Sequence, residues 1–140
     1  MKRYGHLNRE VSRVLACMGH TDSVAITDCG LPVPAGVECI DLSIALGEPA
    51  FVRVLDSVLA DFKAERAVFA TEAKEFNPAV AARAVRLSEQ QVQVEFVTHE
   101  TLKELTRGAH AVIRTGEATS FANVVLYSGV IFGDARRAGP

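Results

Sequence analysis

The chain lacks several features that would assign it to a common functional class. Its 140 residues include no tryptophan, and aromatic residues make up only 6%. No apolar run approaches the roughly 20 residues that a membrane-spanning helix needs. The sequence has neither a GxGxxG fingerprint nor a Walker loop, and its N-terminus has no apolar segment typical of a signal peptide. We therefore expect a cytoplasmic protein without a nucleotide site and without a membrane span.

An excess of basic charge is also absent. The 15 lysine and arginine residues are outnumbered by 17 aspartate and glutamate residues, so the formal net charge is −2. Domains that bind nucleic acid usually carry clustered positive charge. A nucleic-acid partner is therefore not expected.

The cysteines form no recognisable framework. Cys17, Cys29 and Cys39 are odd in number and have no paired spacing, which argues against disulfides. Cys17 and His20 have the spacing of two metal ligands on one helical turn, but zinc would need two further ligands. Cys29 and Cys39 could be proposed for this, yet they form no second close pair. Buried, unreactive thiols are the simpler interpretation, and we expect no metal site.

The chain does contain a strong aliphatic pattern, with 49% hydrophobic residues. Asn8 and Thr98 are suited to cap helices, and Gly19 suits the left-handed position after the first helix. Pro49 can occupy an early helical position. The apolar spacing predicts helices at 8–18, 49–62, 79–90 and 98–108, and strands at 23–28, 37–42, 67–71, 92–97, 109–114 and 123–127.

Strands that alternate with helices predict an α/β fold. We expect a single three-layer domain with a mostly parallel sheet and helices on both faces. No change in composition divides the chain, so residues 1–132 are expected to form this one domain. Residues 133–140 are small and polar, and we expect a disordered tail there.

Polar residues with chemical potential lie at the ends of the first predicted strand. His20 precedes this strand, and Asp28 ends it before a Gly-Leu-Pro-Val-Pro loop. Open α/β sheets bind ligands beyond the carboxyl ends of strands, and histidine can transfer protons near neutral pH. We expect His20 and Asp28 to lie close to this one loop. Both also have structural interpretations, since His20 could bond a helix-end carbonyl and Asp28 could form a turn.

Further candidates occur later in the chain. His99 and Lys103 are four residues apart and therefore share one helix face. Asn123 stands where the last predicted strand begins. A solvated helix face and a turn-capping asparagine are the alternative interpretations of these residues. The residues alone do not decide between the two.

The order of these residues strongly resembles the ribose pyranase/fucose mutarotase family. Residues 19–22 read Gly-His-Thr-Asp, and residues 28–34 read Asp-Cys-Gly-Leu-Pro-Val-Pro, a loop that favours the ribose branch. The similarity runs in order from residue 5 to Phe132. Further matching segments are residues 40–42, 47–51, 72–78, 98–100 with Lys103, 113–117 and 122–123.

This resemblance implies a role for each matching residue. His20 matches the family's proton donor. The positions that match sugar-binding or pocket residues are Asp28, His99, Lys103, Phe121, Ala122 and Asn123. The family has Tyr-Ala-Asn where this chain has Phe121-Ala122-Asn123, so the aromatic ring is kept and its hydroxyl is lost.

The resemblance also implies an activity and an assembly. Members interconvert the pyranose and furanose forms of a free sugar, here most of all D-ribose, by acid–base ring opening without a cofactor. They form closed rings of identical subunits, such as a decamer, in which a neighbouring subunit completes each pocket. We therefore expect a homo-oligomer whose partner molecule is a free monosaccharide.

Other functions stay open at this point. One is mutarotation of a 6-deoxyhexose of the fucose type. Another is sugar binding without catalysis, which the missing tyrosine hydroxyl keeps in consideration. A third is a hydrolase or zinc protein that uses Cys17, His20 and Cys29.

Overall fold

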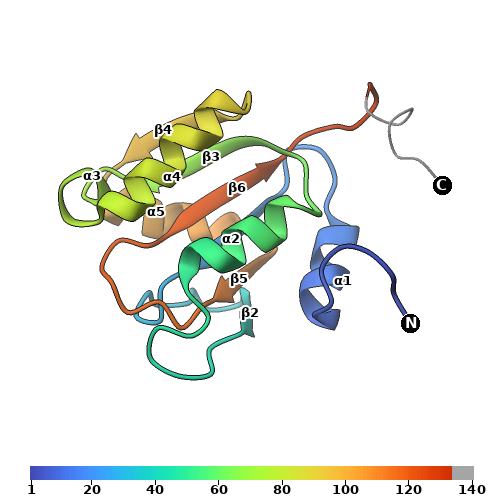
Figure 1. The fold of residues 1–140 in the computed structure, drawn as a ribbon, viewed down its shortest axis with the longest axis horizontal. Helices are drawn as coiled ribbons and strands as arrows, with labels where there is room; N and C mark the ends of the chain where they lie inside the picture. Colours follow the sequence, from blue (N-terminus) through green and yellow to red (C-terminus); the bar gives the residue numbers. More distant parts are fainter. Residues whose placement is uncertain (134–140) are drawn as a thin grey trace.

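A computed structural model describes residues 1–133 (Figure 1). Within this range, six strands form one sheet in the order β2-β5-β1-β6-β3-β4. Strand β6 is antiparallel to its neighbours β1 and β3, and the other pairings are parallel. The strands are β1 (Ser23–Thr27), β2 (Glu38–Asp41), β3 (Ala64–Ala70), β4 (Gln93–Val97), β5 (Ala111–Arg114) and β6 (Val124–Ser128). The expected tail falls almost wholly on residues 134–140, outside the described residues.

Helices cover both faces of this sheet. The helices are α1 (Arg9–Cys17), α2 (Phe51–Leu59), α3 (Ala73–Phe76), α4 (Pro78–Glu89) and α5 (His99–Leu105), with a 3₁₀ turn at Thr106–Gly108. In Figure 1, α2 and α4 lie in front of the sheet and α5 lies behind it. The expected three-layer α/β domain with a mostly parallel sheet is therefore confirmed. None of the helices within residues 1–133 is long and apolar enough to cross a bilayer.

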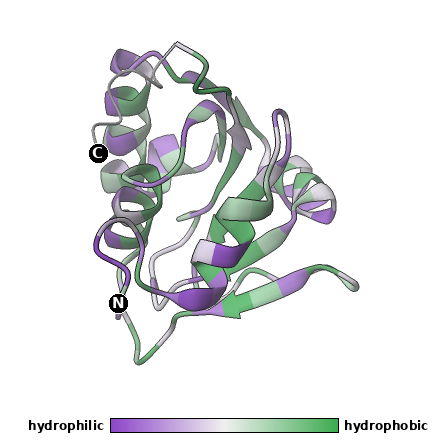
Figure 2. Cartoon of the chain, turned by 90° about the vertical axis from the view of Figure 1, so that its right-hand side faces the viewer, coloured by the Kyte–Doolittle hydropathy of each residue, from purple (hydrophilic) through white to green (hydrophobic). Residues whose placement is uncertain are grey.

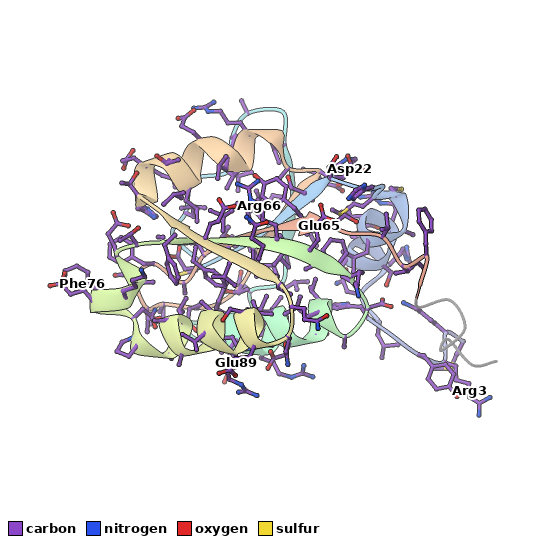
Figure 3. All side chains as sticks on the ribbon, turned by 90° about the horizontal axis from the view of Figure 1, so that it is seen from above. Arg3, Asp22, Glu65, Arg66, Phe76 and Glu89 are labelled. Carbon is purple, nitrogen blue, oxygen red and sulfur yellow. The ribbon has the colours of Figure 1, made fainter. Side chains whose placement is uncertain are left out.

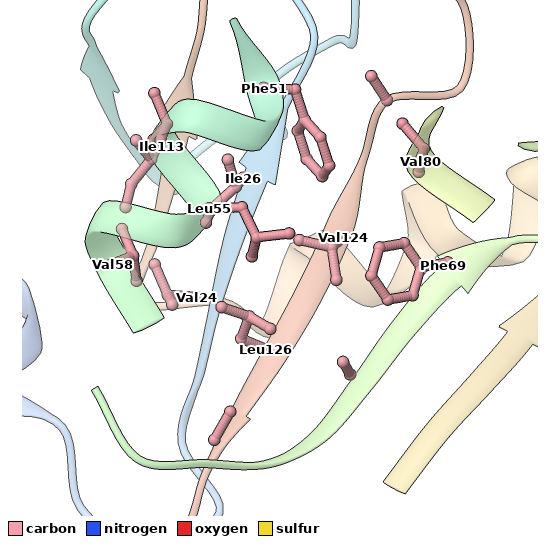
Figure 4. Packing of buried hydrophobic residues seen from close by; sticks show 14 of the residues in the cluster. Val24, Ile26, Phe51, Leu55, Val58, Phe69, Val80, Ile113, Val124 and Leu126 are labelled. Atoms are coloured by element: carbon pink, nitrogen blue, oxygen red, sulfur yellow. The ribbon is translucent and has the colours of Figure 1, made fainter. Parts of the chain in front are cut away.

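The hydrophobic core has two layers, one on each face of the sheet, and the central strand β1 contributes to both. All five of its residues are buried. Val24 and Ile26 pack into a large cluster with Leu55 of α2 (Figure 4). Ala25 belongs to a smaller cluster with Leu102 of α5. Strands covered on both faces have near-continuous apolar sequences, and the strands in Figure 2 are accordingly mostly hydrophobic.

Two local expectations are confirmed and two are wrong. Asn8 caps α1, and its side chain accepts the N–H groups of residues 10 and 11, while Thr98 caps α5. The left-handed residue after α1 is Thr21, with φ 71°, and not Gly19. The chain leaves the helix in an extended conformation, so the tight turn comes later. Pro49 lies ahead of α2, whose N-cap is Ala50, and forms a cis peptide with residue 48.

Strand β3 is longer than predicted because it contains an irregularity. Ala64 pairs with Ser128 and Arg66 pairs with Tyr127, so β3 advances two residues while β6 advances one. Glu65 is therefore the extra residue of a β-bulge. Sequence analysis also missed α3, because a helix of four residues has no periodic repeat to detect.

Candidate functional site

A cavity of about 330 Å³ opens at the carboxyl-terminal ends of the parallel strands. Its walls are formed by the segments that follow β1, β4 and β5. Open α/β sheets bind their ligands at this end of the strands. The lining residues are Asp28, Cys29, Gly30, Leu31, Pro32, His99, Lys103, Glu117, Ala118, Thr119, Ser120 and Phe121.

Asp28 is held rigidly at the cavity wall. One carboxylate oxygen accepts the N–H groups of Gly30 and Leu31, at 3.0 and 2.9 Å, which makes Asp28 a turn former. The other oxygen accepts the side-chain amide of Asn123 at 3.0 Å. A carboxylate has about four acceptor positions, so Asp28 keeps capacity for a donor from a ligand. The structural and the functional interpretations are thus compatible.

Ala122 and Asn123, which the resemblance marks as pocket positions, are not among the residues that line the cavity. Both residues are fully buried. The side-chain oxygen of Asn123 accepts the backbone N–H of Asp28 at 2.9 Å, and its amide donates to the Asp28 carboxylate. Asn123 therefore lies behind Asp28 and orients it.

His99 and Lys103 both face the cavity, as their spacing on α5 predicts. The His99 ring meets the Phe121 ring edge to face, with centroids 5.1 Å apart. The backbone N–H of His99 donates to the carboxylate of Glu72 at 2.9 Å. Its Nδ1 atom is buried without a hydrogen-bond partner in the structure. Lys103 forms an ion pair with Glu100 at 2.7 Å, so its ammonium is already oriented at the rim.

The loop before β6 forms the remaining wall and is tightly braced. Glu117 accepts the N–H of Phe51 at 3.1 Å and both the N–H and the hydroxyl of Thr119. Asn77 donates its side-chain amide to the Thr119 hydroxyl and to the carbonyl of Ser120, each at 2.8 Å. Phe121 closes the loop with φ 62°, a left-handed conformation that is rare for a bulky residue.

Glu117 is the clearest electrostatic feature of this wall. Burial acts to raise the pKa of its carboxyl group, but the hydrogen bonds from Phe51 and Thr119 outweigh burial and hold that pKa below its ordinary value. Glu117 is therefore ionised and bonded at neutral pH. The bonds that shape the loop depend on this charge.

His20 lies at the opposite, amino-terminal end of strand β1, contrary to the expectation that it would share a loop with Asp28. His20 precedes β1 and Asp28 follows it, and a five-residue strand spans roughly 17 Å. His20 is not among the lining residues of the cavity. Figure 3 shows the same separation, with Phe76 of the cavity end at one extreme and Asp22 and Glu65 towards the other.

The turn that carries His20 is fastened at several points. Gly19 donates its N–H to the Asp22 carboxylate at 2.8 Å, and Thr21 donates its N–H to the carbonyl of Ser128 at 2.9 Å. The His20 ring itself is half exposed, and its Nε2 lies 2.9 Å from a carboxylate oxygen of Glu65. His20 bonds this side chain and not a helix-end carbonyl.

The proposed zinc ligands do not converge. Cys17 ends α1, three residues before His20, whereas Cys29 lines the cavity at the carboxyl end of β1. Residues 1–133 contain no group of three or more histidine, cysteine, aspartate or glutamate side chains placed to hold a metal ion. The zinc alternative therefore loses its ligand set.

The sequence did not reveal several residues that shape the cavity and the surroundings of His20. Glu72, Asn77 and Glu117 lay within the matching segments 72–78 and 113–117 and had no assigned role. Glu65 carried no signal at all, because its position depends on a bulge that local periodicity does not reveal.

Comparisons with known proteins agree with this geometry. Residues 1–131 match the RbsD / FucU transport protein family. A protein of Chromobacterium violaceum named D-ribose pyranase is 58% identical over 132 residues, which cover 94% of this chain and 100% of the relative. Bacillus subtilis RbsD complexed with D-ribose has a TM-score of 0.91 and 42% identity, over 94% of this chain and 100% of that structure.

A more distant structure shares the fold alone. The fucose mutarotase of Streptococcus pneumoniae, solved with L-fucose, has a TM-score of 0.74 and 20% identity, over 89% of this chain and 94% of that structure. The family match covers nearly the whole chain, and the ribose-branch protein is the more similar of the two structures. The chain therefore belongs to the RbsD/FucU family.

Proposed function

We propose that this chain is a D-ribose pyranase, a sugar ring isomerase of the cytoplasm that needs no cofactor. The observation that carries the proposal is the braced polar cavity. It presents a carboxylate from Asp28, an imidazole from His99, an ammonium group from Lys103 and the ring of Phe121. Such groups suit a small neutral sugar. High identity to a curated D-ribose pyranase over the whole relative supports this substrate.

The reaction requires only proton transfer and rotation. A base removes the proton of the anomeric hydroxyl while an acid protonates the ring oxygen, so the hemiacetal opens to the aldehyde. The open chain rotates, and a different hydroxyl attacks the carbonyl to close the other ring. Asp28, His99 and Lys103 hold the hydroxyl groups, and Phe121 packs against the carbon face. Asn123 serves by keeping Asp28 oriented.

His20 is the proton donor in this proposal, and a neighbouring subunit supplies it. A chain whose donor lies at the amino end of β1 cannot place it over its own cavity at the carboxyl end. Contacts in which one end of a subunit meets the opposite end of the next generate closed rings when the rotation between subunits closes. We therefore propose a homo-oligomeric ring, such as a decamer, with one sugar pocket at each such interface.

Exchange spectroscopy with free sugars tests the activity. We expect this protein to accelerate interconversion of the pyranose and furanose forms of D-ribose more than that of other pentoses or of 6-deoxyhexoses. A preference for L-fucose would transfer the assignment to the mutarotase branch. Binding of ribose without any acceleration would indicate a non-catalytic sugar-binding module.

Mixing two impaired variants, one in proton transfer and one in sugar binding, tests the shared pocket. His20→Ala and Asp28→Ala subunits, unfolded together and reassembled in equal amounts, should regain about a quarter of the wild-type sites if neighbours share each pocket. The control is each variant reassembled alone. A pocket formed within one chain would give no recovery in the mixture, and a fully active monomer in light scattering would also contradict the proposal.

A further inference from the structure

The contact between His20 and Glu65 joins two elements that are far apart in sequence. The Nε2 atom of His20 lies 2.9 Å from a Glu65 oxygen, within hydrogen-bond distance. Both side chains are about half exposed. Exposed ion pairs of this kind contribute little to folding stability, so stability alone does not account for the arrangement.

The backbone of β3 is distorted at the residue that makes this contact. Glu65 is the extra residue of the bulge opposite Tyr127 and Ser128. Ala64 and Ala67 both belong to the large core cluster although they are three residues apart, which simple alternation along a strand does not permit. The bulge absorbs the odd residue and leaves Glu65 outside the core, towards His20. Bulges frequently redirect a side chain beside a functional site.

The partner loop is constrained as well. Thr21, next to His20, has φ 71°, and a β-branched residue rarely adopts this conformation. The end of β6 gives Glu65 room, because a Cβ atom on Gly129 would lie 3.0 Å from the Cβ of Glu65 and 3.5 Å from its carboxylate. A bulge, a left-handed threonine and a glycine thus meet around one histidine. Uncommon backbone states persist where surrounding structure holds them, and they cluster at active sites.

We propose that Glu65 is the positioning residue of the proton donor, an inference that rests on the proposed function. The Glu65 carboxylate accepts the Nε2–H of His20 and so holds that proton on Nε2. Nδ1 is then the nitrogen that serves the sugar of the neighbouring pocket. The imidazolium gives its Nδ1 proton to the ring oxygen and becomes neutral imidazole that keeps its Nε2 proton. At the same time the base takes the proton of the anomeric hydroxyl, so the sugar stays neutral and the protons balance. Glu65 itself touches no sugar.

Two variants separate this role from a structural one. Glu65→Ala should lower kcat for ribose ring exchange by roughly tenfold, a part of the ~10²–10⁴-fold that a positioned acid or base supplies. KM should change by less than about twofold, because the sugar-binding groups are untouched. Glu65→Gln keeps a carbonyl oxygen that can accept the Nε2–H and should retain most of the activity. Glu95→Ala, which removes a neighbouring carboxylate paired with Arg66, is the matched control and should behave as wild type.

Nitrogen NMR of the assembled, ¹⁵N-histidine-labelled protein gives a readout that does not depend on activity. The His20 signals, assigned by their loss in His20→Gln, are recorded at alkaline pH, where the ring is neutral. They should show protonation on Nε2 in wild type and Glu65→Gln, and a mixture of tautomers in Glu65→Ala. A neutral wild-type ring that carries its proton on Nδ1, or a Glu65→Ala variant with wild-type kcat and tautomer, would overturn the inference alone. Absence of ring exchange in the wild type would instead overturn the proposed function.

Discussion

The two ends of strand β1 are built differently. At the carboxyl end, Asp28 is bonded to Asn123 and to its own turn, and the loop opposite is braced by Glu117 and Asn77. At the amino end, His20 stands on a short turn with its side chain 51% exposed and with Glu65 as a bonded neighbour. The carboxyl end forms a cavity lined by hydrogen-bonded residues, and the amino end presents one oriented side chain, His20.

In the ring proposed above, this difference would divide the work between subunits. Hydrogen bonds within one chain hold the proposed binding groups, so recognition of the sugar would be prepared before assembly. His20, the proposed proton donor, faces outward, so it would act on a sugar held by another subunit. We therefore expect changes at the carboxyl end to affect binding and changes at the amino end to affect rate.

The largest effect is expected at the amino end. His20→Ala should lower ribose ring exchange by about tenfold to a thousandfold, because a positioned acid is lost. Ribose affinity should change far less, since the cavity residues are intact. Exchange spectroscopy and calorimetric titration measure the two quantities. Unchanged exchange in a folded, assembled variant would remove His20 from the mechanism.

The next effect is expected at the carboxyl end. Asp28→Ala should weaken ribose binding by about 1.5–3 kcal/mol, roughly 10- to 150-fold in Kd, the range for a hydrogen bond to a charged group. Asp41→Ala is a suitable control, because Asp41 also forms a turn through the N–H of Ser43 but does not line the cavity. Equal weakening by both variants in a titration would make Asp28 a turn former only.

Phe121 offers a smaller and more diagnostic change. Phe121→Tyr should raise ribose exchange by less than about tenfold, since one neutral hydrogen bond contributes at most about 1.4 kcal/mol. The phenyl ring already packs against His99 and against Phe76, so its position should not change. A much larger gain in exchange rate would show that the natural protein suits ribose poorly, and the ribose assignment would give way to another sugar.

The smallest effect concerns stability in acid. The pKa of Glu117 is held below its ordinary value of 4.5, so its contribution to stability is present above that pH and is lost as the pH falls through the lowered folded-state pKa. Glu117→Gln should therefore be less stable than wild type at about pH 7, and the difference should shrink towards about pH 3. Thermal unfolding across this range measures it, with the exposed Glu104→Gln as control. A difference that does not vary with pH would show that the Glu117 charge does not brace the loop.

Local signals predicted much of the fold. Asn8 and Thr98 cap helices as expected, because capping depends on residues that lie within one turn. The apolar runs gave the strands to within a few residues, except β3, where the bulge at Glu65 extends pairing back to Ala64. The resemblance marked Asp28, His99, Lys103 and Phe121, which all line one cavity. The supporting bonds of Asn77 and Glu117 come from distant segments and left no pattern to detect.

By itself, the sequence determined the α/β class and the alternation of elements, and its family resemblance marked Asp28, His99 and Lys103 of the cavity, because these follow from periodicity, caps and short motifs. Only the tertiary structure decided that His20 and Asp28 lie at opposite ends of strand β1 and that Asn123 orients Asp28 from inside the protein. It also decided that a bulge turns Glu65 towards His20. The physical reason is range. Turns and caps depend on neighbours in the chain, whereas strand order and register arise from contacts between segments many residues apart.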